Sequence, residues 1–223
     1  MAELTIRNKQ IISDLNWVRD KVLSADIERI SQLPDMLLFN PPDAEHDGEK
    51  YLSEFYLNKH MNDPEHVGFP IEHMSAPFDR LSLKNEELKE VELYARTDFV
   101  TNGGANDNAV FLYYPPGGFV GWHTNQNNSG HQFIFSWSEK GDGYFQYYDK
   151  QKKEIIKLPD KAGWQARHFH FGQDEPDHCW HSAYTNVPRI TICLLFRWWD
   201  KPDQKELILE LKDQLIEEIE SEY

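Results

Sequence analysis

The chain has 223 residues, of which 39% are hydrophobic, and this is enough for one substantial core, so we expect a single domain over residues 1–223. Its 38 acidic and 23 basic residues give a formal net charge of −15, which would repel a phosphate backbone and disfavours nucleic acid as a partner. No apolar run approaches the about 18 residues that cross a bilayer, and only two cysteines occur. These features predict a soluble, cytoplasmic protein with no membrane segment and no disulfide framework.

The first hundred residues contain helical patterns. Apolar residues near the start recur every three or four positions and predict a helix with one apolar face; they are Ile11, Leu15, Val18 and Val22. A second helical piece over 27–33 ends at Pro34, and residues 40–48 have the composition of a loop. Residues 51–57 fit either a strand or a helix, whereas 84–93 favour a helix.

From about residue 108 the chain consists of short aromatic and β-branched runs separated by Gly, Asn and Pro, which predicts about eight antiparallel strands. Eight such strands in about 90 residues fit a double-stranded β-helix, or jelly roll. The candidate strands are 108–114, 119–124, 132–138, 143–149, 153–158, 165–171, 178–184 and 190–198.

The fold is therefore expected to be mainly β, with three parts in one domain. Residues 1–107 form a helical and mixed N-terminal support, whose helices pack on the larger sheet, and residues 108–198 form the jelly-roll core. Residues 199–223 add a C-terminal helix, because Ile208, Leu211, Leu215 and Ile219 form an apolar stripe. We expect this helix to pack on its own domain, in a monomer or a homodimer.

The last predicted strand separates two kinds of side chain by alternation. One face is wholly apolar and needs a cover, which the N-terminal helices can supply; it comprises Ile190, Ile192, Leu194 and Phe196. The other face begins with Arg189 and Thr191, which point into the roll, where a buried cation needs an anionic partner. That partner is either a carboxylate ligand or an Asp or Glu of the chain itself.

Two histidines fall on strands that can be neighbours in a jelly roll. His123 ends the second predicted strand and His181 lies in the seventh, so their imidazoles can converge although they are far apart in sequence. Two neutral imidazoles and a short oxygen side chain form a facial triad that leaves open positions on non-haem Fe(II). Asn125, two residues after His123, carries such an oxygen.

The order and spacing of these residues follow the pattern Tyr-x-x-Gly, His-x-Asn, His and Arg-x-Thr, which comprises Tyr114, Gly117, His123, Asn125, His181, Arg189 and Thr191. The pattern resembles the Fe(II)/2-oxoglutarate-dependent oxygenase superfamily, and its spacing is most similar to that of the prolyl-hydroxylase branch. The resemblance covers about residues 108 to 198.

The resemblance implies a role for each residue of the pattern. His123, Asn125 and His181 correspond to the iron ligands, and Arg189 corresponds to the residue that binds the distal carboxylate of 2-oxoglutarate. A guanidinium suits this task because its planar fork matches a carboxylate. The implied hydroxyl donors to the cosubstrate are Tyr114 and Thr191.

The position of Asn125 departs from the family pattern, which normally has an aspartate or glutamate there. An amide oxygen can ligate a metal but brings no negative charge, so Fe(II) would be held more weakly. We predict a dioxygenase that hydroxylates a peptide, a protein side chain or a small molecule and converts 2-oxoglutarate to succinate. The alternatives are a catalytically silent jelly-roll binding protein, which lost turnover through the Asn125 substitution, and a halogenase-like enzyme, which the volume of the Asn side chain disfavours.

Three further histidines are not assigned to the metal site. His168 and His170 share one face of their strand, with Phe169 and Phe171 on the other, and are expected at the inner wall or the rim of the roll. His131 follows an Asn-rich connection and is expected to face solvent or the mouth of the pocket.

Overall fold

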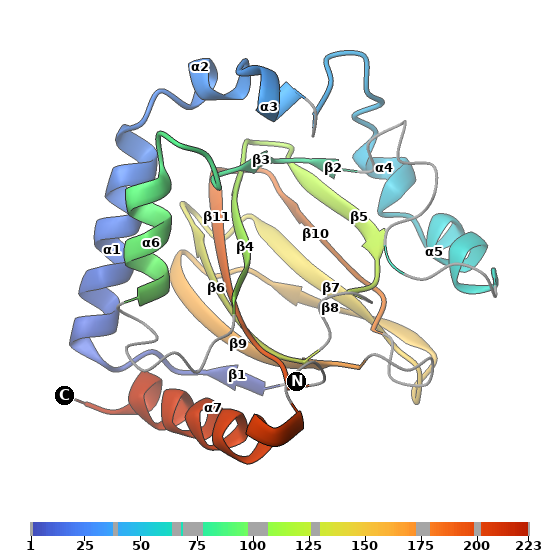
Figure 1. Ribbon diagram of the computed structural model, residues 1–223. Helices are drawn as coiled ribbons and strands as arrows, with labels where there is room; N and C mark the ends of the chain where they lie inside the picture. Colours follow the sequence, from blue (N-terminus) through green and yellow to red (C-terminus); the bar gives the residue numbers. More distant parts are fainter. Residues whose placement is uncertain are drawn as a thin grey trace.

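A computed structural model describes residues 2–37, 40–63, 68, 78–97, 107–125, 130–172, 179–198 and 202–222. In these ranges eleven strands form two antiparallel sheets; in Figure 1 the six-stranded sheet lies on the side of α1 and α6, and the five-stranded sheet lies toward α4 and α5. The strands are β1 Ala2–Leu4, β2 Phe78–Asp79, β3 Leu81–Ser82, β4 Asp107–Tyr114, β5 Phe119–His123, β6 Gly130–Ser138, β7 Gly143–Asp149, β8 Glu154–Pro159, β9 Gly163–Phe171, β10 His181–Thr185 and β11 Arg189–Phe196.

The strand order is that of a double-stranded β-helix. The six-stranded sheet has the order β1-β9-β6-β11-β4-β3, and the five-stranded sheet has the order β2-β5-β10-β7-β8. The chain passes repeatedly from one sheet to the other, so neighbouring strands are mostly distant in sequence. The predicted fold class is confirmed, and β4 to β11 correspond in order to the eight predicted strands, with ends that differ by a few residues. The short strands β1, β2 and β3 were not predicted.

Helices occupy the two ends of the chain, as expected. They are α1 Lys9–Ser24, α2 Ile27–Ser31, α3 Pro34–Leu37, α4 Gly48–Tyr51, α5 Glu54–Met61, α6 Lys89–Thr97 and α7 Lys205–Glu220, which follows the 3-10 turn Pro202–Gln204. Asn8 caps α1, because its side chain accepts hydrogen bonds from the backbone N–H groups of Gln10 and Ile11. Pro34 begins α3 instead of ending a helix, since its fixed φ suits the first helical position. No helix in the described ranges is long and apolar enough to cross a membrane.

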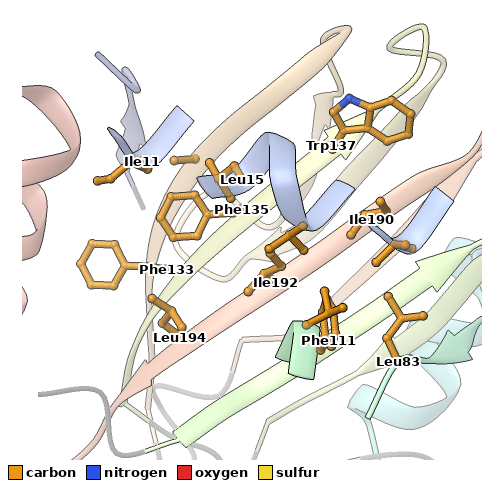
Figure 2. Close-up of a cluster of buried hydrophobic side chains, with 14 of the residues drawn as sticks. Ile11, Leu15, Leu83, Phe111, Phe133, Phe135, Trp137, Ile190, Ile192 and Leu194 are labelled. Carbon is orange, nitrogen blue, oxygen red and sulfur yellow. The ribbon is translucent and has the colours of Figure 1, made fainter. Parts of the chain in front are cut away.

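The outer face of the six-stranded sheet is covered by α1, α6 and α7, which lie along it in Figure 1. Figure 2 shows Ile11 and Leu15 of α1 beside Phe135 of β6 and Ile192 of β11. Leu15, Phe135 and Ile192 are fully buried, and each contributes about 1.5–3 kcal/mol through the removal of apolar surface from water. The N-terminal helices therefore cover the apolar face of the last strand, as its alternation predicted.

The inner faces of the two sheets enclose a second cluster and the candidate site. Apolar side chains from both sheets fill one part of this space, among them Leu112, Ile134, Phe145 and Phe169. On the far side of the five-stranded sheet, α4 and α5 pack against β5. There the indole of Trp122 is fully buried and its Nε1 donates a hydrogen bond to the Leu52 carbonyl at 3.0 Å. β5 is thus held between the helices and the interior, which gives its end a defined position.

Candidate functional site

Two buried histidines meet on the inner wall of the five-stranded sheet. β5 and β10 are hydrogen-bonded neighbours, and His123 is the direct partner of His181 in their register. The two ring centroids are 4.1 Å apart and the ring planes are inclined by 52°. Both residues are nearly inaccessible, with 6% of His123 and 5% of His181 exposed. The sheet thus brings together two imidazoles that are far apart in the sequence.

Backbone carbonyls set the tautomer of both rings. His123 Nδ1 lies 2.8 Å from the Gly121 carbonyl oxygen, and His181 Nδ1 lies 2.9 Å from that of Cys179. A carbonyl oxygen can only accept, so Nδ1 carries the hydrogen in each ring and Nε2 carries the lone pair. This second hydrogen bond is the usual means by which proteins orient a metal-binding imidazole.

Burial keeps both imidazoles neutral. It lowers the pKa of His123 well below its ordinary value, and repulsion from the His181 ring, whenever that ring is protonated, and from Arg80 lowers that pKa further. Burial also lowers the pKa of His181 to about 4, against the opposing effect of the hydrogen bond to Cys179. A neutral imidazole is the form that binds a transition metal, so both rings are ready to do so near pH 7.

Asn125 lies just beyond the end of β5 and lines the same cavity as the two histidines. Its Nδ2 donates a long hydrogen bond of 3.4 Å to Gln132 Oε1, which also accepts from the Cys193 thiol at 3.1 Å. With its nitrogen turned to Gln132, Asn125 presents its oxygen as the atom for a cation. Within the described ranges no group of three or more His, Cys, Asp or Glu could hold a metal. Asn125 offers a neutral oxygen donor on the cavity that the two histidines line.

The cavity between the sheets has a volume of about 210 Å³, which suits a small organic acid better than a drug-sized ligand. Apolar side chains of β4, β6 and β7 form much of its wall. The polar and charged lining consists of Arg80, Ser82, Lys84, Tyr114, His123, Asn125, Gln132, His181, Arg189 and Thr191.

Arg189 is almost fully buried and has a partner within the protein. Its Nε donates to Asp160 Oδ2 at 2.9 Å, its Nη1 to Thr191 Oγ1 at 2.6 Å and its Nη2 to Ser136 Oγ at 3.1 Å. Of the two partners that the sequence left open, an acidic residue of the chain is therefore present. These bonds use three of the five N–H groups of the guanidinium, so each terminal nitrogen retains one N–H for a ligand carboxylate.

Asp160 carries one negative charge and cannot neutralise both of the guanidinium groups that surround it. Its Oδ1 accepts from Gln165 Nε2 at 2.8 Å and from Arg167 Nη1 at 3.4 Å, so one carboxylate lies between two guanidinium groups. Asp160, Arg167 and Arg189 are at most 6% exposed, and together they carry one excess positive charge. A buried excess charge favours an anionic ligand at this end of the cavity.

The two predicted hydroxyl groups also lie at this end. The centre of the Arg189 guanidinium is 5.2 Å from the centroid of the Tyr114 ring, and these residues are partners in the β4–β11 register. Thr191 accepts a hydrogen bond from Arg189, so its own proton can be donated to another acceptor. The structure therefore places all six predicted site residues on one cavity.

The sequence did not identify several residues that shape this cavity. Asp160 and Gln132 carried no local signal, because their partners come from distant strands. Arg80 and Lys84 could have been recognised, since they alternate with the apolar Leu81 and Leu83 as inward residues of a strand would.

The remaining histidine cluster lies on the outer face of the six-stranded sheet, so the expected placement of His168 and His170 at the inner wall or rim was wrong. His131, expected to face solvent or the pocket mouth, is partly exposed and lies in the same outer cluster. His131 Nδ1 is 2.9 Å from His168 Nε2, and the rings of His131 and His170 stack at 4.7 Å. Alternation separated His168 and His170 correctly from Phe169 and Phe171. It did not show that the phenylalanines point inward, where they complete the inner cluster.

No family model matches the sequence, and no match to a curated protein was found. Similar solved structures include a prolyl-4-hydroxylase from Pseudomonas putida, with 13% identity and a TM-score of 0.34 over 63% of this chain and 81% of that chain. YcfD, a ribosomal oxygenase from Escherichia coli, has 17% identity and a TM-score of 0.35 over 62% of this chain and 35% of that chain. The CENP-C cupin domain of Drosophila melanogaster has 9% identity and a TM-score of 0.30 over 76% of this chain and 96% of that chain. At these values the similarity assigns neither an activity nor a substrate to this chain.

Proposed function

We propose that the chain is an Fe(II)- and 2-oxoglutarate-dependent oxygenase that hydroxylates a peptide, a protein side chain or a small molecule. The observation that carries the proposal is the joint presence, on one small cavity, of two neutral imidazoles with oriented Nε2 atoms and a buried guanidinium. The first feature suits a metal ion and the second suits a carboxylate. An enzyme that uses both ligands needs these two features close together.

The described side chains fit the metal, with one neutral donor where a charged one is usual. His123 and His181 would bind Fe(II) through Nε2, and Asn125 would bind it through Oδ1. The bound iron would supply the chemistry by which dioxygen places one oxygen atom in a substrate C–H bond and the other in succinate, as 2-oxoglutarate loses CO2. Asn125 adds no negative charge to this site, and this favours weak metal binding.

The other end of the cavity would orient the cosubstrate. The remaining N–H groups of Arg189 would bind its distal carboxylate in a bidentate manner, and the hydroxyl groups of Thr191 and Tyr114 would donate to the same group. The apolar wall would keep water from this ion pair, which strengthens it. Asp160 would hold Arg189 in the orientation that the carboxylate needs.

The direct test is the release of succinate from 2-oxoglutarate by the full chain with Fe(II) in air. We expect succinate from the unaltered protein and none from His181→Ala. His170→Ala is the matched control, because it removes an imidazole from the outer face of the other sheet and should retain activity. If the protein binds Fe(II) but releases no succinate above the background, the silent binding protein is the better description, and Asn125 is the physical reason.

A further inference from the structure

At the edge of the roll, every second residue of one segment lines the cavity; these residues are Arg80, Ser82 and Lys84. The intervening Leu81 and Leu83 point to the opposite side, where they are buried in the helix-covered core. This is the two-residue period of a strand with one face in each environment. We call the inward set, Arg80, Ser82 and Lys84, the β3 cation face.

The β3 cation face is held by both sheets. β2 pairs with β5 in one sheet and β3 pairs with β4 in the other, so the chain crosses between the sheets at Arg80. The Arg80 carbonyl accepts a hydrogen bond from Asn40 Nδ2 at 2.6 Å, and Leu83 N–H donates to the Phe111 carbonyl at 2.8 Å. The half-buried Arg80 and the exposed Lys84 are therefore fixed at the open edge of the cavity by backbone contacts on both sides.

The charges of these residues act on the interior of the cavity. Arg80 and Lys84 line the same cavity as His123 of β5 and Cys193 of β11. Burial raises the pKa of the Cys193 thiol in β11, and the charge of Lys84 opposes this increase. The two cations thus lie on the same cavity as side chains of both sheets.

The charge of the cavity contrasts with that of the whole chain. Its described lining contains three cationic side chains, Arg80, Lys84 and Arg189, and no carboxylate, whereas the chain has a net charge of −15. A concave site with one sign of charge and low-dielectric walls concentrates ligands of the opposite sign.

We propose that the β3 cation face binds an anionic group of the primary substrate, a carboxylate or a phosphate, while Arg189 binds the cosubstrate. This inference rests on the proposed function, because it assigns the second anion to the substrate of that reaction. The volume of about 210 Å³ suits the entry of a small anionic group, such as one acidic side chain or a small acid. Lys84, at the rim, meets the anion first, and Arg80 lies deeper.

The test measures binding of small probes to the full chain with Mn(II) and 2-oxoglutarate present, by isothermal titration calorimetry. The probes are N-acetyl-aspartate amide, its neutral isostere N-acetyl-asparagine amide and N-acetyl-phosphoserine amide. We expect an acidic probe to bind about tenfold or more tightly than the neutral one, because hydrogen bonds to charged groups are the stronger kind. The better of the two acidic probes identifies the anion as a carboxylate or a phosphate.

Substitutions locate the interaction. Lys84→Gln, which changes an exposed side chain and leaves the fold intact, should remove most of the preference for the acidic probe, and Arg80→Gln should do so as well. Lys140→Gln is the control, since it removes an exposed lysine in the β6–β7 connection, and it should leave the preference unchanged.

The outcomes separate this inference from the proposed function. If 2-oxoglutarate binds but the acidic and neutral probes bind equally, or neither binds at millimolar concentration, the β3 cation face has no such role and the oxygenase proposal stands. If the acidic probe binds through Lys84 while 2-oxoglutarate fails to bind, the anion site is retained and the oxygenase proposal fails.

Discussion

Replacement of Asp160 by asparagine tests the buried charge network behind the cavity. The Asp160 side chain has no exposed surface, and its two oxygens accept hydrogen bonds from Gln165, Arg167 and Arg189. An asparagine would turn one of these acceptors into an N–H2 group that faces a donor, and it would leave two buried guanidinium groups without a counter-charge. Removal of one partner of a buried ion pair costs about 3–5 kcal/mol, which corresponds to a fall in Tm on the order of 10 °C for a chain of this length.

The assay is urea unfolding followed by circular dichroism, together with calorimetric titration of 2-oxoglutarate. We expect Asp160→Asn to lose about 3–5 kcal/mol of unfolding free energy and to bind the cosubstrate more weakly, because Arg189 loses the contact that orients it. Glu154→Gln, with a side chain 54% exposed on the adjacent β8, is the control and should change stability by no more than about 0.5 kcal/mol. A loss below about 1 kcal/mol with unaltered 2-oxoglutarate binding would refute this description of the network.

Two further predictions concern the third metal donor and the outer histidine cluster. Asn125→Asp should strengthen Mn(II) binding about tenfold or more, because it adds a negatively charged ligand. An unchanged Mn(II) affinity in a fluorescence titration would show that residue 125 does not bind the metal. Burial lowers the pKa of His131 to about 3 and of His168 to about 4, from 6.5. Below pH 6.5 the two histidines therefore bind protons in the unfolded chain but not in the folded chain. Their contribution to the free energy of unfolding is fully present above that pH and is lost as the pH falls toward 4. Calorimetry from pH 7 to 4 should show a smaller decrease in Tm for the double variant His131→Gln, His168→Gln; an equal decrease would assign the acid sensitivity elsewhere.

The sequence predicted those parts of the fold that follow from the two-residue alternation of side chains along a strand. Ile190, Ile192 and Leu194 share one face of β11, and this pattern predicted an apolar cover on that side. The other face begins with Arg189 and Thr191, which predicted polar groups in the interior. The placement of His123 and His181 on two predicted strands that can be neighbours in a jelly roll identified them as metal-site candidates, and the two strands do pair.

The rest depends on contacts that no local pattern records. β2 and β3 have two residues each, which is too few for an alternation of polar and apolar residues to be recognised. They form because they pair with the edge strands of sheets whose other strands are distant in sequence. Asp160 is one of 38 acidic residues, and only the placement of β8 beside the interior selects it as the partner of Arg189. The outer position of His131 follows from which face of β6 the helices cover, and alternation cannot decide that.

The central claim is that one cavity binds Fe(II) and 2-oxoglutarate together. The most direct measurement is the visible absorption of the full chain when both are added without oxygen. We expect a broad charge-transfer band that is absent in both His181→Ala and Arg189→Ala, because the first removes a metal ligand and the second removes the carboxylate partner. No band and no iron uptake at saturating Fe(II), in the folded unaltered protein, would contradict it.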